Sequence, residues 1–398
     1  MKKIFPAALT LALAAVLCGS AANAALTPGV LTIWVKSDKN YNGIAEVGRN
    51  FTAQTGTKVI VEHPADLEDL ATMFVREASA GAGPDIIMWA HDRFGDWVNI
   101  GLLSPLQISD DVKGRFANFS WDAMTVDGKI YGYPMSIEAL SLLCNNSLVP
   151  EQPKNFEDFG KLDDQLKAQG ARAILWDYNQ VYYTYLLMAA QGGYAFKNTD
   201  GSYDITDTGV NNEGSIAAVK FLKEMLDNDQ LQKGASYDMA DKQFAQGKLG
   251  CTINGPWSWA RYEEAGIDMS VHPLPNFGGK KTKSFVGVQG LVINAKSPNK
   301  AQARDFIENY LLTDEGLQIV SMEKDLGLAA LTSYANVQEQ DDRVAMTMEN
   351  AKNGEVMPST SQMSLFWDAM NVALKDVFTG NKRPEASLNI AAKRITSK

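Results

Sequence analysis

LTIWV at residues 31–35, KVIVE at 58–62 and IIMW at 86–89 are three short apolar runs, each typical of a buried strand. Between them, residues 44–51 and 67–74 repeat apolar side chains at the spacing of a helix, and glycines follow both patterns. The order strand, helix, strand, helix, strand is typical of a parallel sheet joined by right-handed crossovers. We therefore predict an α/β fold from this part of the chain.

The α/β alternation resumes beyond residue 170 and then gives way to helices. Further strands are predicted at residues 174–176, 249–253 and 285–293, with a helix at 214–227. After Asn299 the pattern predicts helices at residues 301–312, 314–322, 341–353 and 362–378. The chain of 398 residues has no internal repeat, low-complexity segment or Ser/Pro-rich linker. We therefore predict two domains, between which the chain crosses several times.

Residues 89–95, WAHDRFG, place an aromatic ring, a carboxylate and a guanidinium directly after the third predicted strand. Ligands of open α/β sheets bind at the carboxyl ends of the strands. Trp89 offers a flat apolar surface, whereas Asp92 and Arg93 offer hydrogen bonds of opposite polarity. A pyranose has apolar C–H faces and a rim of hydroxyls, so the motif predicts a sugar site. The alternative is a structural ion pair between Asp92 and Arg93.

The amino terminus has the pattern of a secretory signal peptide. Two lysines precede an apolar run at residues 4–17, and residues 22–24 (ANA) form a small-x-small cleavage site. The apolar run is shorter than a membrane-spanning helix, and a leucine before Cys18 argues against lipoprotein processing. We predict a signal peptide at residues 1–24, cleaved after Ala24, and an exported protein that is periplasmic in a Gram-negative cell.

The mature chain is acidic and retains two cysteines. Removal of Lys2 and Lys3 takes the formal charge from −10 to −12, which argues against nucleic acid or an anionic membrane as a partner. Cys144 and Cys251 both lie in apolar, strand-like runs. Export permits a disulfide bond between them. We nevertheless predict two buried thiols, because free cysteine packs well as a small hydrophobe.

Seven blocks of sequence occur in a fixed order, and together they identify a protein family more specifically than any single motif does. The blocks are DKNYNG at residues 38–43, WAHDRFG at 89–95, EALSL at 138–142, GGYAF at 192–196, NGPW at 254–257, ENYLLTDEG at 308–316 and MSLFW at 363–367. They resemble the periplasmic maltose/maltodextrin-binding proteins, which belong to the extracellular solute-binding proteins of ABC transporters. The similarity extends from about residue 31 to the carboxyl terminus.

The resemblance implies an α/β, two-lobed periplasmic-binding-protein fold. Each lobe would be a mainly parallel sheet flanked by helices, with the ligand cleft between the lobes. The implied boundaries are residues 25–136 plus 290–338 for the N-terminal lobe, 141–286 plus 341–398 for the C-terminal lobe, and a hinge near 136–140, 287–290 and 337–340. It also implies a monomer that passes its sugar to a membrane ABC permease, and it leaves a chemoreceptor open as a second partner.

The resemblance further implies which side chains contact the sugar. The candidate ligand-binding residues are Asp38, Lys39, Glu68, Trp89, Asp92, Arg93, Glu138, Tyr182, Trp257 and Trp367. The charged members would bond sugar hydroxyls, and the aromatic members would stack on sugar rings. The alternatives are a solvated turn for Asp38 and Lys39, a solvated helix face for Glu68, and core positions for the aromatic residues.

The chain departs from the family pattern near the predicted cleft. Gln180 and Val181 stand where the family commonly has Glu-Pro, so Gln180 keeps a hydrogen-bonding arm without the charge and is a further candidate. Asp368 and Asn371 replace a tyrosine and an arginine, which removes stacking area from an outlying subsite. These changes predict an altered preference among chain lengths, and they leave another α-glucoside open as the ligand.

We predict a binding protein rather than an enzyme. Asp38, Asp92 and Glu138 could supply the two carboxylates of a glycoside hydrolase, but nothing around them marks a proton donor beside a nucleophile. The three histidines lack metal-ligand spacing, so we predict no metal or cofactor and a structural role for His91. The predicted function is a high-affinity receptor for maltose and maltodextrins that closes around its ligand. A carbohydrate-sensing subunit is the alternative.

Overall fold

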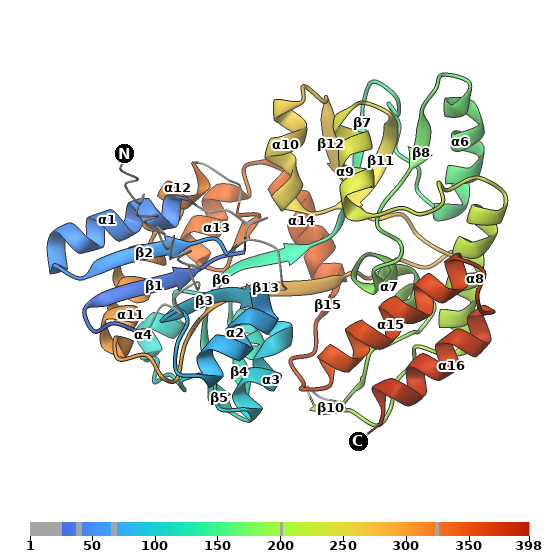
Figure 1. Ribbon diagram of the computed structural model, residues 1–398. Coiled ribbons are helices and arrows are strands. Elements are labelled where there is room, and N and C mark those ends of the chain that lie inside the picture. Colours follow the sequence, from blue (N-terminus) through green and yellow to red (C-terminus); the bar gives the residue numbers. More distant parts are fainter. Residues whose placement is uncertain (1–25, 37–41, 65–69, 200–201, 323–325, 398) are drawn as a thin grey trace, which may run out of the picture.

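The computed structural model describes residues 26–36, 42–64, 70–199, 202–322 and 326–397. Their helices and strands form two lobes, each with its own sheet (Figure 1). The predicted two-lobed α/β architecture is thus confirmed. The predicted signal peptide, Asp38, Lys39 and Glu68 lie outside the described residues. Within the part of the chain that is described, no helix is long and apolar enough to cross a membrane.

The first lobe is built on a seven-stranded sheet of order β14-β6-β13-β3-β1-β2, with β15 beside β13. The strands are β1 (Val30–Trp34), β2 (Lys58–Glu62), β3 (Ile86–Ala90), β6 (Gly132–Ala139), β13 (Phe285–Ile293), β14 (Leu328–Ala329) and β15 (Glu355–Val356). β1 runs parallel to β2 and β3, and β15 runs parallel to β13. β13 is antiparallel to β3 and β6, and β14 is antiparallel to β6.

Helices and a small hairpin surround this sheet. They are α1 (Gly43–Thr55), α2 (Leu70–Ser79), α3 (Phe94–Asn99), α4 (Asp110–Lys113), α5 (Asn118–Ala123), the hairpin β4 (Thr125–Val126) and β5 (Lys129–Ile130), α11 (Lys300–Phe306), η4 (Ile307–Leu311), α12 (Asp314–Ser321) and α13 (Thr332–Gln338). The apolar stripe predicted at 44–51 is the buried face of α1, which packs on β2 and α12.

The second lobe is built on a four-stranded sheet of order β12-β7-β11-β8. Its strands are β7 (Ser141–Asn145), β8 (Arg172–Ile174), β11 (Leu249–Asn254) and β12 (Met269–His272). β11 and β12 are antiparallel to β7, and only β8 and β11 pair in parallel. The expectation of a mainly parallel sheet is therefore wrong for this lobe, because the apolar pattern of a strand does not encode its direction relative to a neighbour.

The remaining elements complete this second lobe. They are η2 (Phe156–Asp158), α6 (Phe159–Lys167), α7 (Val181–Ala190), β9 (Lys197–Thr199), β10 (Ser202–Asp204), α8 (Glu213–Asp227), α9 (Tyr237–Ala245), η3 (Pro256–Ser258), α10 (Trp259–Glu264), α14 (Asp342–Asn353), α15 (Met363–Phe378) and α16 (Pro384–Ile395). α15 and α16 pack against each other and on α8, at the carboxyl-terminal end of the chain.

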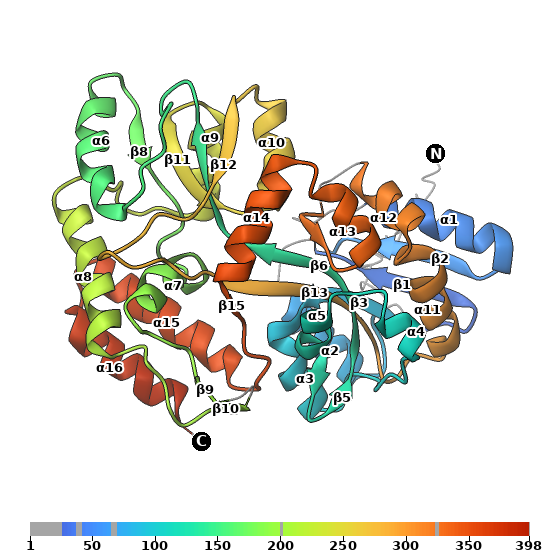
Figure 2. The same cartoon turned by 180° about the vertical axis from the view of Figure 1, so that it is seen from behind.

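The chain passes from the first sheet to the second where β6 ends and β7 begins, with Leu140 between them. β6 and β13 lie in the middle of the molecule, between the two groups of helices (Figure 2). β12 of the second sheet is followed by β13 of the first, so the chain crosses again within residues 273–284. These crossings lie close to parts of the predicted hinge, whose boundaries stay a prediction.

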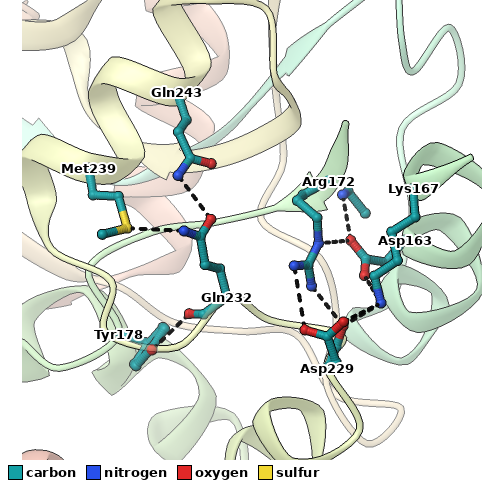
Figure 3. Close-up of polar contacts among 9 residues, drawn as sticks. Asp163, Lys167, Arg172, Tyr178, Asp229, Gln232, Met239 and Gln243 are labelled. Atoms are coloured by element: carbon teal, nitrogen blue, oxygen red, sulfur yellow. Dashed lines mark hydrogen bonds and ion pairs between the residues drawn. The ribbon is translucent and has the colours of Figure 1, made fainter. Parts of the chain in front are cut away.

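A buried carboxylate fastens α6 to the second sheet. Asp163 accepts hydrogen bonds from Arg172 Nε and from the backbone N–H of Ala173, both at 2.9 Å, and Lys167 Nζ lies 3.1 Å from its second oxygen (Figure 3). Asp229 contacts the same two cations at the surface. A buried carboxylate is costly unless it is paired and hydrogen-bonded, and this arrangement satisfies both conditions.

Cys144 and Cys251 form a disulfide bond. The two residues lie directly opposite each other in the antiparallel pair β7 and β11, with their Cα atoms 4.1 Å apart. The prediction of two buried thiols is therefore wrong. Both cysteines are buried and lie in strands, as predicted, but the apolar runs alone did not reveal that the strands are neighbours in this register.

Candidate functional site

A cavity of about 550 Å³ lies between the two lobes. All the candidate residues that the structure describes line it, namely Trp89, Asp92, Arg93, Glu138, Gln180, Tyr182, Trp257 and Trp367. Trp89, Asp92, Arg93 and Glu138 come from the first lobe, and the others come from the second. The structure thus brings together residues that are up to 278 positions apart in the chain, from Trp89 to Trp367.

The part of the cavity wall that the first lobe contributes begins at the end of β3, where the chain enters the short 3₁₀ turn η1 (His91–Arg93). His91 is buried: its Nε2 donates to the carbonyl of Met357 at 2.7 Å, and its Nδ1 accepts from the N–H of Val288 at 3.1 Å. Burial lowers the pKa of His91 to about 4, so the ring is neutral near pH 7 and can accept on Nδ1. His91 therefore anchors the turn that carries Asp92 and Arg93 and is structural, as predicted.

Asp92 connects the two lobes. The indole Nε1 of Trp367, on α15, donates a hydrogen bond to Asp92 Oδ2 at 2.9 Å. Arg93 Nε lies 3.9 Å from the same oxygen, which makes a loose ion pair. Burial raises the pKa of Asp92 to about 6, and the positive charge of Arg93 and the hydrogen bond from Trp367 partly offset the effect of burial. The carboxylate thus lies at the cavity wall with a perturbed pKa.

The second-lobe wall is aromatic. The ring of Tyr182 lies 6.5 Å from that of Trp367 and 5.1 Å from that of Tyr183, and Tyr183 lies 6.2 Å from Tyr237, measured between ring centroids. Burial and the nearby carboxylates Glu138 and Asp92 raise the pKa of Tyr182, so its hydroxyl stays protonated. These rings provide flat apolar surfaces with hydroxyl groups at their edges.

Trp257 reaches the cavity because of the glycine that precedes its turn. Gly255 is the N-cap of η3, and a Cβ atom placed on it would lie 2.1 Å from the Trp257 ring. Only glycine therefore allows the indole to fold back against the backbone at this point. The ring is half-buried in the cavity wall and is not a core residue, which was the alternative.

The departures from the family pattern at Gln180 and Asn371 help to fix the start of α7. Asn371 Oδ1 accepts a hydrogen bond at 2.8 Å from the backbone N–H of Val181, one of the free donors at the helix start. The Gln180 side chain hydrogen-bonds the carboxylate of Asp177. Both residues also line the cavity. Their polar groups therefore support Tyr182, which follows in the first turn.

Several residues of the cavity wall were not predicted from the sequence. They are Lys36, Tyr183, Tyr237, Asp238, Gln289 and Met357. Tyr237 and Asp238 begin α9, after the N-cap Ser236, and nothing in that local pattern distinguishes a cavity wall from a solvated helix start. Gln289 carried a usable signal, because it is a lone polar residue within the apolar run at 285–293.

Comparison with known proteins identifies the family. Residues 46–353 match the bacterial extracellular solute-binding protein family. The chain belongs to this family. A galactooligosaccharide-binding protein of Bacillus subtilis is 30% identical to this solute-binding protein, over 97% of this chain and 94% of the relative. A maltooligosaccharide ABC transporter solute-binding lipoprotein of Streptococcus pneumoniae is 30% identical over 92% and 88%, and a maltodextrin-binding protein of B. subtilis is 27% identical over 98% and 95%.

Proposed function

We propose that this solute-binding protein is an exported receptor for maltose and linear maltodextrins. The observation that carries the proposal is one interlobe cavity that combines the aromatic rings of Trp89, Tyr182, Trp257 and Trp367 with the charged groups of Asp92, Arg93 and Glu138. Apolar rings match the C–H faces of glucose units, and charged groups match their hydroxyls. Relatives named for maltooligosaccharide and maltodextrin binding support this choice of sugar.

Ligand binding would close the two lobes around the sugar. Polar groups from both lobes line one cavity, so a bound sugar contacts both lobes at once, and the closed form binds it better than an open form does. The bond from Trp367 to Asp92 shows that the lobes come within hydrogen-bonding distance. We propose that the hinge lies near residues 136–140, 287–290 and 337–340, and that the closed monomer docks on a membrane ABC permease without catalysing a reaction.

A galacto-oligosaccharide is the second candidate ligand, because a relative named for that sugar is as similar to this chain as the maltooligosaccharide relative is. Thermal unfolding with maltotriose and with a galacto-oligosaccharide of equal length separates the two. We expect the larger rise in unfolding temperature with maltotriose. A larger rise with the galacto-oligosaccharide would instead identify that sugar as the preferred ligand. A separate test distinguishes transport from sensing alone: deletion of the gene should abolish maltodextrin uptake if the protein serves transport.

The proposed role of Asp92 predicts that affinity depends on pH. Its ionised carboxylate accepts sugar hydroxyls, and its pKa is raised to about 6. Maltotriose affinity should therefore be constant above pH 7 and should fall by up to about tenfold for each pH unit below 6. Calorimetric titrations at pH 5, 6, 7 and 8 measure this, with Asp92→Asn as the control: it should bind more weakly at pH 8 and lose the pH dependence. An equally steep profile in that variant would assign the dependence to another group.

A further inference from the structure

β13 carries one polar side chain in the otherwise apolar and glycine-containing sequence FVGVQGLVI, residues 285–293. This side chain, Gln289, is 6% exposed and lies in the cavity wall. Gly287, two residues earlier, lines the same cavity, as expected for alternate residues of a strand. Burial of an amide is costly unless the amide is hydrogen-bonded, so a glutamine in this strand needs a partner.

The partner of Gln289 is a carboxylate on the neighbouring strand. Gln289 Nε2 donates a hydrogen bond to Glu138 Oε2 at 3.0 Å, and both side chains are buried. In the register of β6 and β13, Glu138 pairs with Gly287 and Ser136 pairs with Gln289, so the amide reaches Glu138 diagonally across the strands. Among the described residues, the Gln289 side chain has Glu138 as its one hydrogen-bond partner.

We propose that Gln289 is a positioning and specificity-determining residue for the oligosaccharide, an inference that rests on the proposed function. Its Nε2 holds the Glu138 carboxylate in one orientation at the cavity wall, so less side-chain freedom is lost when a sugar hydroxyl binds there. The oriented carboxylate recognises a hydroxyl of one sugar unit, and a sugar without that hydroxyl loses this hydrogen bond at a buried carboxylate.

Calorimetric titration with maltotriose tests this role. Gln289→Leu removes the amide and keeps the approximate volume, and it should weaken maltotriose binding at least tenfold. Gln289→Met repeats the test with a flexible side chain in case the branched leucine does not fit. The matched control is Gln191→Leu, because Gln191 is a half-buried glutamine outside the cavity whose Nε2 donates to the carbonyl of Phe277 at 2.7 Å. The control should bind within twofold of wild type.

A double-mutant cycle with Glu138→Leu separates positioning from an independent contact. If Gln289 acts through Glu138, Gln289→Leu should weaken binding less than threefold once Glu138→Leu is present. A folded Gln289→Leu or Gln289→Met variant with wild-type affinity overturns the inference and leaves the proposed function intact. If the loss of affinity in the double variant equals the product of the two single losses, Gln289 does not act through Glu138 and the positioning role is overturned. Failure of the folded wild type to bind any oligosaccharide overturns the proposed function and this role with it.

Discussion

Trp257→Ala is expected to weaken maltotriose binding at least tenfold while the protein remains folded. The Trp257 ring lies half-buried in the cavity wall and is packed back against Gly255, so it is held in place before a ligand arrives. Truncation of a well-packed tryptophan at a protein interface to alanine often costs about 2 kcal/mol or more of binding free energy, and about 1.4 kcal/mol already corresponds to a factor of ten. Calorimetric titration of the wild type and the variant measures the effect.

Two further variants separate stacking from general damage to the fold. Trp257→Phe keeps a smaller ring and should bind with an affinity between those of the wild type and Trp257→Ala. Phe119→Ala removes a 38% exposed aromatic side chain of α5 that does not line this cavity, and its affinity should match the wild type. If Trp257→Ala binds maltotriose as tightly as the wild type, the assignment of Trp257 as a stacking surface is wrong.

Removal of the disulfide bond is expected to lower the free energy of unfolding by about 2–5 kcal/mol. Cys144 and Cys251 are 107 residues apart in the chain, and the bond between them restricts the unfolded state of a long loop. Urea unfolding of the double variant Cys144→Ala/Cys251→Ala, compared with the oxidised wild type, measures the change. Wild type unfolded in the presence of a reductant should show the same loss.

Sugar binding by the double cysteine variant is the control for this prediction. Neither cysteine lines the cavity, so the folded double variant should bind maltotriose within twofold of wild type. Two reactive thiols in unreduced, denatured wild type would contradict the disulfide itself. Equal urea midpoints for the double variant and the oxidised wild type would instead contradict its contribution to stability.

Local periodicity was sufficient to predict much of the fold. β2 and β13 have the predicted bounds, and α8 begins one residue before the predicted helix, because continuous apolar runs and helical stripes are local signals. β6 was not predicted as a strand, since Pro134, Ser136 and Glu138 interrupt its apolar pattern. The strand and helix alternation correctly predicted that β1 runs parallel to β2 and β3. The direction of the second-lobe strands and the register of all strands could not be predicted, because they depend on contacts between distant segments, such as β7 with β11.

The candidate site was predictable where a family pattern marked it. The local motif at residues 89–95 supplied Trp89, Asp92 and Arg93. The resemblance supplied the other described candidates, and the structure brings all of them to one cavity. Their role in sugar binding remains a prediction. Tyr183 and Tyr237 reach the cavity through the packing of α7 and α9, which no short motif encodes. Gln289 was marked only as a lone polar residue in the apolar run that forms β13. The bond between Asp92 and Trp367 likewise depends on how the lobes meet.

Titration of the refolded chain from residue 25 onwards with maltotriose, followed by tryptophan fluorescence, tests the proposed function most directly. Refolding removes sugar that remains bound during purification, and Trp89, Trp257 and Trp367 lie in the cavity wall as reporters. We expect a saturable change at micromolar concentrations, which corresponds to a binding free energy of about 8 kcal/mol. No saturable change, from a protein whose circular dichroism and cooperative unfolding show that it is folded, would contradict a maltodextrin receptor.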